Sequence, residues 1–141
     1  MRRYRVLEQG LTACLMMFVA GCATTAPPEK AVGEPLQERP IQDLRSVAGN
    51  WNGFIRLDPL GRTFPLRMTI KEDGSYQAYS SYASGGADVM IDGTMQLANG
   101  KIVTQSSMGH SSTVTLYEGQ GKRVLKFVRA DGASGEIEPA K

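Results

Sequence analysis

Apolar and polar residues alternate along much of the chain after residue 45, and this alternation predicts β-strands. Residues 64–70 have apolar side chains at every second position, and residues 89–97 repeat the pattern. In a strand, every second side chain points to the same face, so each run has one apolar and one polar face. No apolar stripe at helical spacing interrupts these runs. The pattern therefore predicts an all-β domain over residues 46–141.

Gly93 lies on the apolar face of the second run, where two interpretations are open. It could be a turn residue after Asp92, but a turn there would divide the run into two very short strands. A glycine inside a strand permits a bend or the close approach of another backbone. We therefore expect Gly93 to have a structural role within a strand.

Seven turn signals divide this part of the chain into eight segments. Most of them place glycine beside asparagine, aspartate, serine or another polar residue, and each is short enough for a hairpin. They lie at residues 58–61, 72–74, 84–86, 99–100, 108–110, 118–121 and 130–132. Helical crossovers have no room, so the strands should form an antiparallel meander. Closing about eight such strands into a small up-and-down β-barrel would remove the exposed sheet edges.

One segment fits this scheme poorly. Residues 101–108 have the sequence KIVTQSSM, in which apolar and polar positions alternate badly. The pattern leaves open which face of this segment points inward.

A Gly-x-Trp motif, formed by Gly49 and Trp51, stands at the start of the first segment and contains the only tryptophan of the chain. The motif resembles the opening signature of lipocalins and related calycin barrels, and residues 93–101 are similar to a strand-turn-strand of small bacterial lipocalin-like domains. The resemblance implies structural roles for Gly49 and Trp51, with Trp51 closing one end of the barrel. It also implies that a basic residue from a late strand packs across the indole ring. Arg129 is the first candidate for this cation-π contact and Lys126 the second.

The interior of such a barrel has two possible states, because eight strands leave room either for side chains or for one small ligand. The large apolar residues at inward positions could fill it completely. Alternatively, an apolar pocket opens at one mouth, where Trp51, Tyr76, Tyr82 and Met90 are the candidate ligand-binding residues. Tyr76 and Tyr82 share a strand face, whereas Tyr79 lies on the other.

The N-terminus follows a different pattern. Arg2, Arg3 and Arg5 precede a continuous apolar run at residues 11–20, which is the layout of a signal peptide. The run is about ten residues long, whereas a transmembrane helix needs roughly twenty. We therefore expect an export signal at residues 1–21 and no membrane-spanning anchor there.

Residues 19–22, VAGC, end this run and resemble the lipobox of bacterial lipoproteins. The resemblance implies cleavage before Cys22 and lipidation of its sulfur, so that the lipid holds the protein in a membrane. In Gram-negative lipoproteins an aspartate after the cysteine commonly causes retention in the inner membrane. Ala23 therefore favours the outer membrane, with the domain facing the periplasm of the cell envelope. An ordinary secretory signal with a chance cysteine and a twin-arginine signal remain as alternatives.

Cleavage and lipidation at Cys22 would change the thiol content and the charge of the mature chain. Cys14 would leave with the signal and Cys22 would carry the lipid, so no disulfide and no cysteine-ligated zinc site is expected. Removal of three arginines and one glutamate would take the charged residues from 16 basic and 14 acidic to 13 of each. A near-neutral mature chain offers no electrostatic footprint for nucleic acid.

Residues 22–45 separate the lipidation site from the β-domain. They hold four of the seven prolines, alternate in charge and contain no aromatic residue. Such a segment cannot bury enough apolar surface to offset the entropy of ordering. We therefore expect a flexible tether that ends where the domain begins, at residue 46.

Candidates for catalysis are few. His110 is the only histidine and lies in an expected turn beside Ser111 and Ser112, but the sequence positions no aspartate near it. Asp88 and Asp92 would share a strand face, yet two carboxylates without a third ligand make a weak metal site. The sequence therefore predicts no enzyme, no metal and no cofactor.

Two functions fit this organisation. The first is a lipid-anchored protein whose barrel binds or carries a small apolar ligand. The second is an envelope interaction or inhibitor module that binds a protein or peptidoglycan through its outer face or loops. A dry interior volume on the order of a few hundred Å³, open at one mouth, would favour the first function. A fully packed interior would leave the second.

Overall fold

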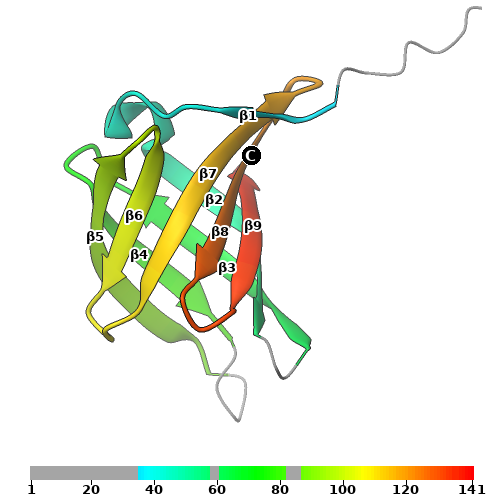
Figure 1. Cartoon of the computed structure of the whole chain (residues 1–141). Helices are drawn as coiled ribbons and strands as arrows, with labels where there is room; N and C mark the ends of the chain where they lie inside the picture. The colour runs from blue at the N-terminus through cyan, green and yellow to red at the C-terminus, as the bar shows by residue number, and fades with distance from the viewer. Residues whose placement is uncertain (1–34, 58–60, 82–86) are drawn as a thin grey trace, which may run out of the picture. The chain divides into compact units, whose positions relative to one another are not determined.

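The computed structural model describes residues 35–57, 61–81 and 87–141, which form an antiparallel β-barrel (Figure 1). A 3-10 helix, η1 (Leu44–Val47), lies between the first two strands. The strands are β1 (Gln37–Arg39), β2 (Gly49–Leu57), β3 (Arg62–Ile70), β4 (Ser75–Ser80), β5 (Val89–Ala98), β6 (Lys101–Ser106), β7 (Ser111–Gly119), β8 (Lys122–Arg129) and β9 (Ser134–Pro139). Among the described residues, no helix is long and apolar enough to cross a membrane.

The barrel is closed. Each strand from β2 to β9 pairs antiparallel with the next along the chain, and β9 returns to pair with β2. The short β1 pairs with β7, where Gln37 lies opposite Glu118. Because the sheet closes, each of the eight barrel strands pairs with a neighbour on both sides along at least part of its length. The expected all-β, up-and-down barrel of about eight strands is confirmed.

Two of the connections are two-residue turns at the positions that the sequence predicts. Asn99 and Gly100 both have positive φ, 52° and 74°, and Gln120 and Gly121 repeat this with 55° and 70°. Positive φ at both central residues is the type I′ geometry, whose twist matches that of the flanking strands. These turns hold β5 against β6 and β7 against β8.

The two ends of the barrel are built differently. The strands β2, β4, β6 and β8 begin at the end that carries η1, and the odd-numbered strands of the ring begin at the other, because successive strands are antiparallel. We call the end with η1 the closed end; it lies at the top of Figure 1. We call the opposite end, where β2, β4, β6 and β8 finish, the open end.

The folded domain begins earlier than expected. Ile41 is only 2% exposed, and its backbone N–H donates to the Gly100 carbonyl at 2.7 Å. Asp43 caps η1 by accepting a hydrogen bond from the Arg45 N–H at 3.0 Å. The expectation of a tether up to residue 45 is therefore wrong, because β1 and Ile41 complete a core and a sheet supplied by distant strands. Residues 1–34, with the expected signal peptide, Cys22 and the rest of the tether, lie outside the described residues.

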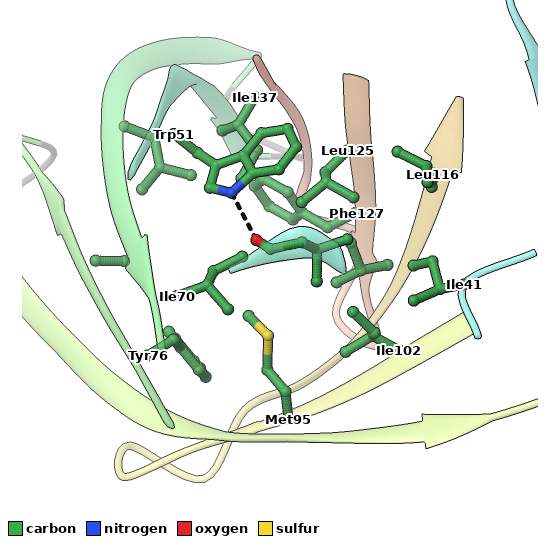
Figure 2. Close-up of a cluster of buried hydrophobic side chains, with 14 of the residues drawn as sticks. Ile41, Trp51, Ile70, Tyr76, Met95, Ile102, Leu116, Leu125, Phe127 and Ile137 are labelled. Carbon is green, nitrogen blue, oxygen red and sulfur yellow. Dashed lines mark hydrogen bonds between the residues drawn. The ribbon is translucent and has the colours of Figure 1, made fainter. Parts of the chain in front are cut away.

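Buried apolar side chains pack together inside the barrel (Figure 2). Every ring strand contributes to this core, as does the segment before β2. Its buried members are Ile41, Val47, Trp51, Ile55, Leu66, Ile70, Tyr76, Ala78, Met95, Ile102, Val114, Leu116, Leu125, Phe127 and Ile137.

Gly93 lies in the middle of β5, as expected, and not in a turn. A Cβ atom built there would lie 2.2 Å from the Gln105 carbonyl oxygen and 2.8 Å from the Tyr76 ring. Those distances are far below contact, so only glycine lets β6 and Tyr76 approach this closely. Gly49 has a different reason to be glycine: its φ of 132° is a conformation that other residues rarely adopt.

Candidate functional site

Trp51 fills the closed end of the barrel. Its side chain is 2% exposed, and its indole N–H donates to the Val47 carbonyl at 2.9 Å, as the dashed line in Figure 2 marks. A buried indole needs such an acceptor, and here the last residue of η1 supplies it. The tryptophan thus ties the helix to the barrel wall. Contrary to expectation, it does not line the interior cavity described below.

Arg129 does not pack on Trp51, and that expectation is wrong. β8 runs from the closed end to the open end, so Arg129 at its last position lies at the end opposite the tryptophan. Arg123, the second residue of β8, lies at the closed end instead. Its Nη2 donates to the Ser46 carbonyl at 2.9 Å, and its Nε donates to Glu118 at 2.7 Å. Arg123 therefore holds η1 against β7 and β8.

Lys126, the second candidate for the cation-π contact with Trp51, contacts other residues instead. Its Nζ lies 5.2 Å from the centroid of the Tyr117 ring and 2.8 Å from a Glu136 oxygen. Both contacts are on the outer face of the barrel, because Lys126 alternates with the buried Leu125 and Phe127.

An apolar cavity occupies the barrel interior between the closed end and the open end. The space in which the centre of a water molecule can be placed is about 60 Å³. Most of its wall is aliphatic, with residues such as Ile70, Ile102 and Leu125 at the deep end. The interior is thus neither fully packed nor as roomy as a pocket of roughly 300 Å³ or more.

β6 supplies a polar stripe to this otherwise apolar wall. Ile102, Thr104 and Ser106 are buried and point inward, whereas Val103 and Gln105 point outward. This answers the question that the sequence left open for residues 101–108. The alternation there is poor because the inward positions become hydroxyl residues toward the open end.

Of the predicted ligand-binding residues that the structure describes, Tyr76 alone lines the cavity. Burial raises the pKa of its hydroxyl, and the Asp92 charge adds to this, whereas a hydrogen bond with Thr104 opposes it. The phenol therefore remains neutral at physiological pH. Tyr76 and Thr104 form a polar pair within the apolar wall.

A cluster of polar side chains surrounds the cavity at the open end. Ser106, His110, Ser112 and Arg129 all line it and come from neighbouring positions in β6, the following turn, β7 and β8. The backbone N–H of His110 donates to the Ser106 hydroxyl at 3.1 Å. Within the described residues, neither the His110 imidazole nor the Ser112 hydroxyl has a hydrogen-bond partner of its own.

Asp131 holds Arg129 in place. Arg129 Nε donates to Asp131 Oδ1 and Nη2 donates to Oδ2, both at 2.6 Å. The hydrogen bonds from Arg129 lower the pKa of the Asp131 carboxyl to about 2, with smaller contributions from the Ala133 N–H and from the charges of Arg129 and His110. Both partners are therefore charged over the physiological pH range, and together they are neutral.

Met90 does not line the cavity, contrary to expectation. It is 53% exposed on the outer face, opposite Tyr79 of β4, which is 36% exposed. An outward position follows from the alternation of β5, in which Ile91 and Met95 point inward. Tyr82 lies outside the described residues.

The polar residues of the open end are those that the sequence reasoning missed as a group. Ser106, Ser112 and Asp131 had no assigned role, His110 was expected in a solvated turn, and Arg129 was assigned to the wrong end. Two signals could have found them: the broken alternation of residues 101–108 and the direction of each strand in a meander.

Within the described residues, no group of three or more histidine, cysteine, aspartate or glutamate side chains could hold a metal ion. Asp88 instead accepts hydrogen bonds from Arg67 and Ser81, at 2.8 and 2.6 Å. No protein-family model, curated protein or solved structure matches the chain.

Proposed function

We propose that this protein is a lipid-anchored lipoprotein of the bacterial cell envelope, and that its barrel binds a small, slender apolar ligand. The lipobox at residues 19–22 supports the anchoring. The single observation that carries the binding role is the apolar cavity inside the barrel, which has polar side chains only on one wall and near one end.

The size of the cavity limits the ligand. A water molecule needs roughly 10–15 Å³ of the space that its centre can reach, so about 60 Å³ is room for several small groups. A single alkyl chain is only a little wider than a water molecule and fits such a space, whereas a bulky ring system does not. Met68 and Met95, whose side chains are flexible, line the cavity and can adapt to the chain.

The two ends give the ligand one direction of entry. Val47 and Trp51 are 0% and 2% exposed at the closed end. Ile91, His110 and Arg129 are only half-buried at the open end. A ligand therefore enters at the open end, and its apolar part lies along the aliphatic wall.

Native mass spectrometry of the full chain, extracted gently from an envelope fraction, tests the binding role. We expect a bound low-molecular-mass apolar species on the wild-type protein. Ala78→Met should remove it, because Ala78 is buried in the cavity wall and the larger side chain takes up the free space. Gln77→Met is the matched control, since the neighbouring Gln77 points outward from the same strand.

Circular dichroism should show that both variants remain folded. Wild-type protein without any bound species, and without affinity for an added alkyl alcohol, would contradict the binding role.

The anchoring is tested separately with Cys22→Ala. We expect an uncleaved or soluble precursor, whereas wild-type protein should resist salt washes and be released by detergent, because acyl burial contributes roughly 0.8 kcal/mol per methylene. Membrane attachment that survives the substitution would show that the lipobox interpretation is wrong.

The alternative function, an envelope interaction module, has one specific observation in its favour. Tyr79 and Met90 form an exposed cross-strand pair on the outer face, and Arg67 lies opposite Tyr79 on its other side. Tyrosine, methionine and arginine are enriched in protein interfaces. Loss of a cross-linked envelope partner from Met90→Ser protein, with ligand binding unchanged, would support this function.

A further inference from the structure

The mouth of the cavity has two chemically different sides. Ser106, Ser112 and Arg129, on β6, β7 and β8, form a polar side, and the lining becomes apolar on the adjoining β5 and β4, at Ile91 and Ala78. A purely apolar ligand at the mouth would exclude water from the Ser112 hydroxyl and from the Arg129 donors that Asp131 does not engage, and each buried unpartnered group costs roughly 1–3 kcal/mol. The mouth therefore suits a ligand that has a polar head.

Arg129 is positioned to contact such a head. Its side chain is only 16% exposed, and it lines the cavity. Asp131 engages Nε and Nη2, and a guanidinium carries five N–H donors, so donors on Nη1 and Nη2 remain. Because Asp131 holds the guanidinium in a bidentate pair, the remaining donors have a defined direction.

The charge of the pair decides which head group is favoured. Asp131 neutralises Arg129, and the carboxyl of Asp131 stays ionised because hydrogen bonds from Arg129 lower its pKa to about 2. A carboxylate head would gain from Arg129 but be repelled by Asp131, and it would also lose its hydration. An uncharged oxygen accepts the same hydrogen bonds without this repulsion.

We propose that the open end recognises the head group of a single-chain amphiphile, that Arg129 is the specificity-determining residue, and that an uncharged oxygen-bearing head is preferred over a carboxylate. This inference rests on the proposed function, because the alkyl chain must occupy the interior cavity. Ser112 and His110 are the further groups that can hydrogen-bond the head.

Calorimetric titration of the full chain carrying Cys22→Ser, which removes the attached lipid, tests the preference. The probes are 1-decanol and decanoate, both below the concentration at which they self-associate, at pH 8, where histidine is ordinarily neutral. We expect wild-type protein to bind decanol about five-fold more tightly than decanoate. Arg129→Gln should weaken decanol binding about five-fold, through the loss of a hydrogen bond.

Asp131→Asn separates charge from structure. It leaves Arg129 in place but removes the opposing charge, so decanoate should bind about ten-fold more tightly and the preference should reverse. Arg67→Gln is the matched control, because Arg67 also pairs with an aspartate, Asp88, but on the outer face. It should leave both affinities unchanged.

The outcomes distinguish the two proposals. If neither probe binds wild-type protein, the proposed function fails and this inference fails with it. If decanol and decanoate have the same affinity for wild type, and also the same affinity for Asp131→Asn, only the head-group preference is overturned. Should Arg129→Gln fail to fold by circular dichroism, the double variant with Asp131→Asn leaves no unpaired charge and should bind decanol about five-fold more weakly than wild type, whereas unchanged decanol affinity would overturn the role of Arg129.

Discussion

The two ends of the barrel are made from the same strands but use their inward side chains differently. At the closed end, Ile41, Val47 and Trp51 are at most 2% exposed, and the indole N–H is matched to a backbone carbonyl. At the open end, His110 and Arg129 are half-buried and polar. The closed end is organised for stability, and the open end retains hydrogen-bonding groups that the fold itself does not use.

This difference has a physical cause. A polar group buried without a partner is costly, whereas one at a mouth remains partly hydrated until a ligand arrives. Polar side chains are therefore tolerated at the open end and would be costly at the closed end. The contrast predicts that substitutions at the closed end change mainly stability and that those at the open end change mainly binding.

Trp51→Ala should have the largest effect on stability. Loss of a buried aromatic side chain costs about 3–5 kcal/mol, which we expect in the free energy of unfolding measured by urea denaturation. Trp51→Phe should cost less, about 1–2 kcal/mol, because it keeps much of the packing and loses the hydrogen bond to Val47. A loss below about 1 kcal/mol for Trp51→Ala would contradict a stabilising role of the closed end.

Ile41→Ala tests whether the segment before η1 belongs to the domain. Ile41 is 2% exposed, so we expect a loss of about 3 kcal/mol in the free energy of unfolding. Leu36, five positions earlier, is 37% exposed and provides the control: Leu36→Ala should cost less than about 0.5 kcal/mol. If the two substitutions lowered the free energy of unfolding equally, this segment would be a tether and not part of the domain.

Arg123→Gln should have an intermediate effect. It removes the hydrogen bond to the Ser46 carbonyl and the ion pair with Glu118, and we expect a loss of about 1 kcal/mol in urea denaturation. The exposed neighbour Lys122 is the control, and Lys122→Gln should change stability by no more than about 0.5 kcal/mol. The reverse order would mean that β8 does not fasten η1.

Asp131→Asn should have the smallest effect on stability, and the effect should depend on pH. The pKa of Asp131 is lowered to about 2 in the folded state, so its stabilisation is present above the ordinary carboxyl pKa of about 4 and is lost as the pH falls toward 2. Because Asp131 is exposed, we expect less than about 1 kcal/mol at pH 7. Denaturation at pH 7, 4 and 2 should show the variant and wild type converging, and a gap that widens in acid would contradict this.

Much of the barrel could be predicted from local patterns. The alternation in residues 64–70 and the turn at Asn99-Gly100 depend on neighbours in the chain, and the structure has both as expected. Gly93 was also expected inside a strand, because a turn there would leave strands that are too short. The start of the domain was missed because Ile41 is buried by side chains that come from distant strands.

The candidate site could be predicted only in part. Tyr76 was identified because aromatic residues with a polar tip suit a pocket wall, whereas Met90 was placed at the rim although its strand parity points it outward. The polar residues of the open end come from three strands and two turns, and no short motif joins them. Their one local signal was the poor alternation of residues 101–108. That signal can be interpreted only when the barrel shows which of these positions point inward.

The sequence by itself determined the strands, the turns and the closed antiparallel order, because alternation and turn chemistry act between residues close in the chain. Only the tertiary structure decided which end each side chain reaches. Arg129 and Arg123 are six positions apart on one strand, yet one meets Asp131 at the open end and the other meets Ser46 at the closed end. The direction of a strand depends on how many strands precede it in the ring, and therefore on the fold as a whole.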